Sequence, residues 1–234
     1  YEIVSRDWSS DVCSSNLSKV LAFLPYVLNC SVILFPGRSY SDDGICSVVE
    51  IAVEETQKPI LECHKNCKCN DNRCRNRRVG KPNTLNLTVF KTENRGYGLK
   101  SDSRICRGEF VSEYLGEYIT KEEARHRSAN GSTENIYIIS VNEYYSNSKS
   151  QCFIDARRYG NNARFINHSC DPNLLGLIVR VGVNYPRLAL FACRDIEAGE
   201  EVTFSYGSCH SDLSSRPCFC GSTQCLGFLP HDKY

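Results

Sequence analysis

Residues 164–173 of this 234-residue chain read Arg164-Phe165-Ile166-Asn167-His168-Ser169-Cys170-Asp171-Pro172-Asn173. An amide, an imidazole and a thiol stand almost side by side in this segment, between apolar runs of the sequence. Polar groups enclosed in this way need hydrogen-bonding or metal partners. A self-satisfied turn is the alternative, because Asp-Pro favours turn formation. The segment alone therefore does not indicate a function.

Three cysteines stand close together near the C-terminus, in the pattern Cys218-x-Cys220-x4-Cys225. Cysteines at this spacing are better placed to share a metal than to pair as disulfides. Three thiolates can occupy three corners of a zinc tetrahedron, and Cys170 of the polar segment is the best candidate for the fourth corner. A zinc ion there would join the C-terminus to the middle of the chain. Three unrelated free thiols are the alternative.

A second cluster, Cys63-x3-Cys67-x-Cys69-x4-Cys74, lies in a segment too polar to form a hydrophobic core. Its spacing also indicates a metal site. The chain has fifteen cysteines in all, an odd number and clustered, which predicts a reducing compartment and bound zinc. The arginines at 73, 75, 77 and 78 leave open a direct contact with nucleic acid. A solvated face is favoured, because no aromatic residues are interleaved for base stacking.

The overall composition is that of an ordinary globular domain. The formal net charge is +1 and 41% of the residues are hydrophobic, so no global field directs the chain to nucleic acid or to a membrane. No run reaches the roughly 18 apolar residues of a membrane span, and we expect no membrane partner. Residues 1–45 show no clear pattern, and we expect them to lack a packed core. Residues 6–17 resemble a translated sequencing adaptor, and we expect them to contribute nothing to the fold.

Many short apolar runs and few helical patterns predict a mainly β fold of small sheets. Thr120 and Glu123 form a capping box, so we expect a helix to begin at Lys121, with a polar loop over 128–133. Turns are expected at 96–98 and 197–200. Strands are expected over 85–89, 110–119 (two, around Gly116), 135–141, 151–156, 174–183, 187–193 and 201–206.

Five motifs in this order resemble the SET-domain lysine methyltransferases: GYG at 96–98, EYLGEYI at 113–119, RFINHSCDPN at 164–173, AGEEVTFSYG at 198–207 and CFCGSTQC at 218–225. The Cys/Arg segment resembles the second half of the pre-SET region in the histone H3 lysine-9 type enzymes. The resemblance runs from about residue 63 to the C-terminus. It implies a SET fold, mainly β with short helices and a knot-like crossing. The implied division is an atypical N-terminal segment (1–45), a partial pre-SET (46–84), a SET domain (85–208) and a post-SET (209–234).

The resemblance also implies a function: transfer of methyl groups from S-adenosylmethionine to a lysine of the histone H3 tail, on chromatin in the nucleus, with zinc bound by the cysteines. Tyr206 would be the catalytic tyrosine, with Tyr137 beside it, and Phe204 would control how many methyl groups fit. The backbone at 96–98 would approach the cofactor, where glycine leaves room. The implied cofactor-binding residues are Gly96, Tyr97, Gly98, Tyr137, Arg164, Asn167 and His168.

The chain departs from the family pattern in three places. Tyr97 stands where the family has tryptophan, and Ser205 stands where it has the aspartate before the catalytic tyrosine. The family's pre-SET holds three zinc ions with nine cysteines, but the first five are missing here and only Cys46 remains nearby. Four thiolates cannot hold three zinc ions in that pattern, although they can hold one. The alternative to an active enzyme is therefore a catalytically impaired, zinc-stabilised chromatin-binding module.

Overall fold

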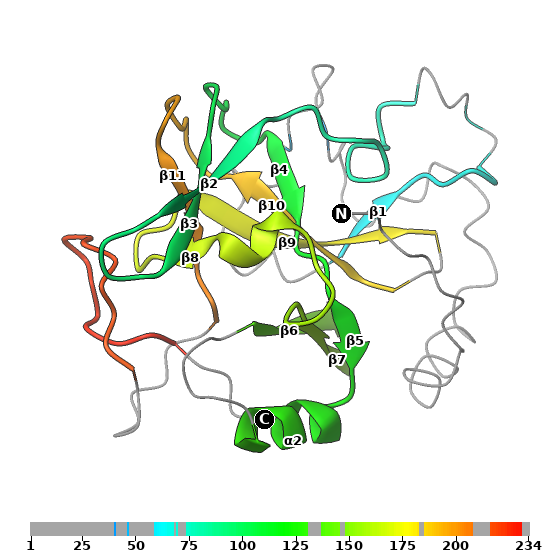
Figure 1. Cartoon of the computed structure of the whole chain (residues 1–234). Helices are drawn as coiled ribbons and strands as arrows, with labels where there is room; N and C mark the ends of the chain where they lie inside the picture. Colours follow the sequence, from blue (N-terminus) through cyan, green and yellow to red (C-terminus); the bar gives the residue numbers. More distant parts are fainter. Residues whose placement is uncertain are drawn as a thin grey trace.

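Three small β-sheets form the framework of the protein (Figure 1). The structure is a computed structural model, and it describes residues 40, 46, 59–67, 69, 74–130, 137–145, 148–182, 185–207 and 216–230. The strands are β1 (Ile60–Glu62), β2 (Leu87–Lys91), β3 (Tyr97–Ser101), β4 (Phe110–Glu113), β5 (Glu117–Ile119), β6 (Ile138–Tyr145), β7 (Ser148–Asp155), β8 (Asn167–His168), β9 (Leu174–Val181), β10 (Arg187–Ala192) and β11 (Glu201–Phe204). The helices are α2 (Lys121–Asn130) and the 3-10 helix η3 (Asn162–Phe165).

The strand order of each sheet places distant segments side by side. One sheet has the order β1-β9-β10-β4, the second β2-β3-β11-β8, and the third β5-β7-β6. β11 pairs antiparallel with β3 and parallel with β8, where Thr203 is opposite Asn167 and Phe204 is opposite His168. The polar segment quoted first and the motif at 198–207 are therefore neighbours. The predicted mainly β architecture of small sheets with short helices is confirmed.

The hydrophobic core lies on both sides of β10. Leu188 and Leu190 face the main cluster, whereas Ala189 and Phe191 face a second cluster. Successive side chains of a strand point to opposite faces, so a strand covered on both faces must be apolar throughout. This explains the uninterrupted sequence LALFA at 188–192.

The one α-helix in the described part of the chain begins as its capping box predicts. The Glu123 N–H donates to Thr120 Oγ1 at 3.2 Å, and α2 starts at Lys121. The predicted loop at 128–133 is wrong for its first three residues, because the helix continues to Asn130. Its last turn is anchored through Arg127, which forms ion pairs of 2.9 Å with Glu117 and with the buried Asp155.

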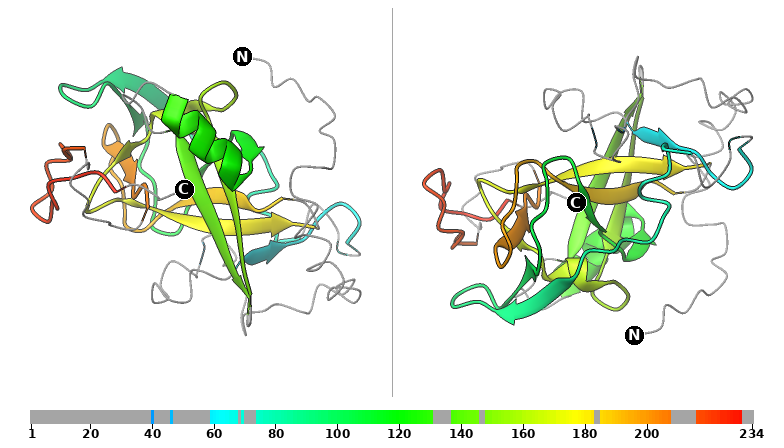
Figure 2. Two further views of the ribbon diagram at one scale, coloured as in Figure 1. Left: turned by 90° about the horizontal axis from the view of Figure 1, so that it is seen from below. Right: turned by 90° about the horizontal axis from the view of Figure 1, so that it is seen from above.

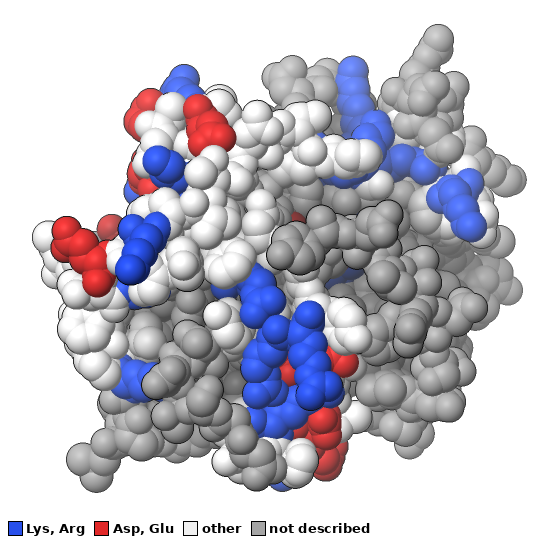
Figure 3. Space-filling view, viewed as in Figure 1, with Lys and Arg blue, Asp and Glu red and all other residues white. Residues whose placement is uncertain are grey.

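The arrangement around α2 is visible in two pictures. Figure 2 shows the helix lying across the β6–β7 hairpin. Figure 3 shows one group of positive side chains above α2, with negative side chains beside it. No helix among the described residues is long and apolar enough to span a membrane.

Several element boundaries differ from the expectation. The strand expected at 85–89 is β2 at Leu87–Lys91, and the expected turn at 96–98 contains only Gly96, since β3 begins at Tyr97. The last expected strand ends two residues early, at Phe204. β1 was not predicted; it pairs in parallel with β9.

The first residue that the structure describes, Tyr40, is buried with 2% of its surface exposed. It packs in the second core cluster with Phe191, so this residue of the N-terminal segment contributes to the core of the sheet. The expectation that residues 1–45 lack a packed core stays a prediction. Residues 1–39 and 41–45, including 6–17, lie outside the described residues.

The carboxylate of Glu62 joins Tyr40 to the segment that follows β1. It accepts the Tyr40 hydroxyl at 2.7 Å and the backbone N–H groups of Arg78, Val79 and Gly80 at 2.9, 2.7 and 2.9 Å. A buried carboxylate is costly unless such donors surround it, and here four of them do.

We expect Glu62→Gln to lower the free energy of unfolding by about 2 kcal/mol, because the amide turns two N–H donors toward groups that also donate. Urea unfolding measures this. The control is Glu93→Gln at an exposed glutamate, which should stay within about 0.5 kcal/mol of the wild type. Equal stabilities of the two variants would contradict the assigned role of Glu62.

Candidate active site and cysteine clusters

Tyr206 lies just beyond the end of β11 and is held at both ends. Its hydroxyl donates to the carbonyl oxygen of Ile166 at 3.0 Å, and its backbone N–H donates to His168 Nδ1 at 3.3 Å. Its ring centroid is 5.1 Å from that of Phe204. Residues 166–168 and the end of β11 therefore fix the position of the phenol together.

Three ionisable side chains at this site, those of Tyr206, Tyr114 and His168, are uncharged near neutral pH. Burial raises the pKa of Tyr206 above its ordinary value, and burial also raises the pKa of Tyr114. Burial lowers the pKa of His168 to about 4, so its imidazole is neutral and Nδ1 can accept the Tyr206 N–H. The other ring nitrogen, Nε2, lies 3.4 Å from Cys170 Sγ.

One residue of this site was missed in the sequence. Tyr114 is 3% exposed, its hydroxyl donates to the Tyr137 carbonyl at 3.1 Å, and its ring centroid is 6.0 Å from that of Phe204. The available signal was its position in EYLGEYI, one of the five motifs. Tyr114, Phe204 and Tyr206 together make an aromatic cluster at the meeting point of β4, β11 and residues 166–168.

The predicted cofactor-binding side chains form a continuous set of contacts. The guanidinium of Arg164 lies 4.8 Å from the centroid of the Tyr137 ring, and Tyr97 packs edge-on against Phe165 at 6.1 Å. Asn167 Nδ2 donates to the carbonyl oxygen of Tyr97 at 3.1 Å. The structure therefore brings the GYG turn, Tyr137 and residues 164–167 to one place.

The glycines at 96 and 98 fit their positions for two different reasons. Gly96 has a φ of 70°, a conformation that residues with a side chain rarely adopt. A Cβ on Gly98 would lie 2.7 Å from Glu201 Oε1. At position 98 the missing side chain thus leaves room for a carboxylate of the protein itself.

These residues fit a ligand that carries an aromatic ring and charged groups, and S-adenosylmethionine is such a ligand. Tyr97 is 59% exposed and offers an aromatic face. Arg164 Nε is buried and has no acceptor among the described residues. Asn167 Nδ2 makes the two hydrogen bonds that its protons allow, which leaves Oδ1 as an acceptor.

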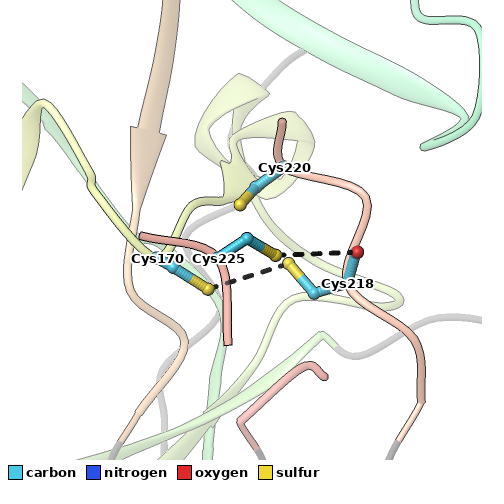
Figure 4. Close-up of side chains that lie close together, drawn as sticks. All are labelled: Cys170, Cys218, Cys220 and Cys225. Atoms are coloured by element: carbon cyan, nitrogen blue, oxygen red, sulfur yellow. Dashed lines mark hydrogen bonds between the residues drawn. The ribbon is translucent and has the colours of Figure 1, made fainter. Parts of the chain in front are cut away.

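Four sulfur atoms converge where the C-terminal segment meets residues 167–173 (Figure 4). The Sγ atoms of Cys170, Cys218, Cys220 and Cys225 lie within 4.8 Å of one another. The Leu226 N–H donates to Cys170 Sγ and the Gly227 N–H to Cys225 Sγ, each at 3.4 Å. Backbone donors of this kind stabilise thiolates around a metal, so the donor set fits one tetrahedral zinc ion.

The second cluster is less complete. Cys63, Cys69 and Cys74 have their sulfurs within 4.8 Å of one another, but Cys67 lies outside this group and its Sγ accepts the His64 N–H. The buried Arg77 donates to Cys69 Sγ at 3.3 Å. A nearby guanidinium favours the thiolate form, so three ligands for one metal ion are available here. Cys67 as a fourth ligand stays a prediction.

Comparison with known proteins gives the family. The model of the SET domain matches residues 96–207. The histone-lysine N-methyltransferase SETMAR of Mus musculus is 39% identical over 207 residues, which cover 82% of this chain and 67% of that protein. The human SETMAR is 36% identical over 90% of this chain but only 32% of its own length. The H3 lysine-9 specific dim-5 of Neurospora crassa is 34% identical, over 81% of this chain and 64% of that protein. The chain belongs to the SET-domain histone-lysine methyltransferases.

Solved structures agree with this assignment. The methyltransferase domain of human SETMAR superposes with a TM-score of 0.72 at 34% identity, covering 84% of this chain and 74% of that chain. Arabidopsis thaliana SUVH6, solved in complex with S-adenosylmethionine, gives 0.68 at 32% identity, over 81% of this chain and 41% of that chain. The predicted SET fold is confirmed.

We expect metal analysis of the purified chain to return about one or two zinc ions per molecule, since two cysteine groups are present and one is incomplete. Cys218→Ser should remove about one of them. Cys106→Ser, at an exposed cysteine outside both groups, is the control and should remove none. A content of about four zinc ions, or an unchanged content in Cys218→Ser, would contradict this interpretation.

Proposed function

We propose that this chain transfers methyl groups from S-adenosylmethionine to a lysine side chain of the histone H3 tail, acting on chromatin in the nucleus. The observation that carries the proposal is the cluster of Tyr114, Phe204 and Tyr206 beside residues 164–168. Two relatives support the substrate: dim-5 is named H3 lysine-9 specific, and KRYPTONITE was solved with an H3(1–15) peptide.

The roles of the residues follow from the reaction. Bound S-adenosylmethionine would supply a methyl group on its sulfonium. A neutral lysine amine would attack that methyl group in line, and the S–C bond would break to release S-adenosylhomocysteine. The aromatic rings of Tyr114, Phe204 and Tyr206 provide apolar walls, which lower the pKa of a lysine amine placed among them. The Tyr206 hydroxyl and the Ile166 carbonyl can contact a polarised methyl group through weak C–H···O bonds. The protein then contributes mainly by positioning the reactants.

The tyrosines are not bases in this proposal. Burial raises the pKa of both Tyr206 and Tyr114, so their hydroxyls keep their protons near neutral pH. The lysine must therefore lose its proton before it attacks.

The second candidate is a catalytically impaired SET module that binds chromatin. The incomplete group of Cys63, Cys69 and Cys74 is the observation that favours it. A methyl-transfer assay of the chain on a histone peptide array separates the two candidates. Methylation of H3 peptides supports the enzyme, whereas cofactor binding without transfer to any peptide supports the module. A chain that binds DNA but no S-adenosylmethionine would instead support a basic zinc module for nucleic acid.

We expect Tyr206→Phe to lower the rate of methyl transfer by about 100-fold, because one hydroxyl at the point of transfer is lost. Affinity for S-adenosylmethionine should change little, since the substitution removes only one weak C–H···O contact with the cofactor's methyl group. Steady-state kinetics and calorimetric titration measure the two quantities. The same substitution at the exposed Tyr159 is the control. An unaltered rate in Tyr206→Phe would remove this residue from the mechanism.

We expect the wild-type protein to form mainly di- and trimethyl-lysine, and Phe204→Tyr to shift the product toward monomethyl-lysine. A tyrosine hydroxyl at position 204 can hold a water beside the amine, in the space that a further methyl group needs. Mass spectrometry of an H3 peptide after exhaustive reaction measures the proportions of mono-, di- and trimethyl-lysine. Phe219→Tyr, at an exposed phenylalanine, is the control and should leave these proportions unchanged. A wild type that stops at monomethyl-lysine would show that Phe204 does not lie beside the lysine amine.

A further inference from the structure

Glu201, the first residue of β11, has both carboxylate oxygens occupied by partners from other elements. Its Oε1 accepts a hydrogen bond from Asn167 Nδ2 at 2.9 Å, and its Oε2 forms an ion pair with Arg95 Nη2 at 2.6 Å. Arg95 lies between β2 and β3, directly before the GYG turn. One carboxylate thus joins β11, β8 and the hairpin that carries Tyr97.

This carboxylate also determines which way the Asn167 amide faces. Nδ2 donates to Glu201 Oε1 and to the Tyr97 carbonyl, and neither of these oxygens can donate in return. The nitrogen must therefore face them, and the oxygen Oδ1 faces away. Among the described residues no donor is bonded to Oδ1.

The space for the carboxylate comes from Gly98. A Cβ on this residue would lie 2.7 Å from Glu201 Oε1 and 3.0 Å from side-chain atoms of Phe90 and Thr92. Because Gly98 has no side chain, Oε1 can reach Asn167 from the strand next to β3. Gly98 and Glu201 therefore belong to one arrangement.

We propose that Glu201 is a positioning residue, which fixes the Asn167 amide so that Oδ1 accepts a hydrogen bond from the α-ammonium group of S-adenosylmethionine. This rests on the proposed function. An ammonium group can only donate, so it needs an acceptor oxygen, and a flipped amide would present N–H groups instead. Glu201 acts through Asn167 and does not touch the reacting atoms.

The adjacent Glu200 provides a matched control. It too forms an ion pair with an arginine, Arg194, at 2.6 Å, and accepts from an asparagine amide, Asn173 Nδ2, at 3.1 Å. Its asparagine is not among the proposed cofactor residues. Replacing either glutamate removes one ion pair and one side-chain amide contact, and at Glu200 it also removes the acceptor of the Glu197 N–H at 3.0 Å. Only the replacement of Glu201 is expected to affect the cofactor.

The test uses two ligands: S-adenosylhomocysteine and its analogue in which hydrogen replaces the α-amino group. We expect Glu201→Ala to raise the dissociation constant for S-adenosylhomocysteine about tenfold and that for the analogue less than about twofold. Glu200→Ala should change neither constant by more than about twofold. Glu201→Gln keeps an acceptor oxygen for Asn167 and should recover most of the affinity. In methyl transfer, Glu201→Ala should raise KM for S-adenosylmethionine with little change in kcat.

Equal weakening of both ligands by Glu201→Ala, or an equal effect of Glu200→Ala, overturns the inference. If Glu201→Ala does not fold, Glu201→Asp takes its place, because the shorter side chain keeps the charge but cannot reach both partners; the same outcomes apply. A wild-type chain that binds no S-adenosylhomocysteine overturns the proposed function as well. The remaining outcome is a wild type that binds S-adenosylhomocysteine and methylates H3 peptides, while the Glu201 variants weaken both ligands equally or neither. This outcome overturns the present inference but not the proposed function.

Discussion

The side chain of Asn173 makes the pair of hydrogen bonds on which the arrangement of the site depends. It is 2% exposed, its Nδ2 donates to the Glu201 carbonyl at 2.9 Å, and its Oδ1 accepts the Thr203 N–H at 2.8 Å. The amide thus pairs with the backbone of β11 as a neighbouring strand would. Separating residues 167–173 from β11 would leave buried backbone groups unpaired, which is costly. The parallel pairing of β8 with β11 continues the same contact toward Tyr206.

This attachment joins the cysteine cluster to the tyrosine site. Cys170 lies between β8 and Asn173, both of which pair with β11. The position of residues 167–173 on β11 therefore places the Cys170 sulfur beside the C-terminal cysteines. His168 lies between the two centres, with Nδ1 accepting the Tyr206 N–H and Nε2 close to Cys170 Sγ. A zinc ion bound by Cys170 would therefore restrain, through one imidazole, the backbone that carries the tyrosine. In this arrangement a bound metal would support the site from outside the group of tyrosines.

Local patterns in the sequence predicted the parts of the structure that depend on neighbouring residues. The capping box at Thr120 gave the start of α2, and the runs at 174–183 and 187–193 gave β9 and β10 within a few residues. The parts not predicted depend on residues far apart in the chain. β1 is a three-residue strand whose Glu62 is bonded to Tyr40, and the Gly98 contact requires Glu201. No local pattern contains such contacts; the SET fold was predicted only through the order of its motifs.

The protonation states of the inner residues limit what kind of chemistry the site can perform. Burial keeps the pKa of Tyr206 and Tyr114 above the ordinary range and lowers that of His168 to about 4. Between about pH 5 and the ordinary range of tyrosine, none of the three changes charge. A lysine amine, with an ordinary pKa of about 10.4, is then the group whose proton decides whether the reaction can start. Neutral aromatic surroundings favour the uncharged amine, because they solvate its cation less well than water does. The pH dependence of transfer should therefore follow the substrate amine, which the protein makes reactive by desolvation and orientation.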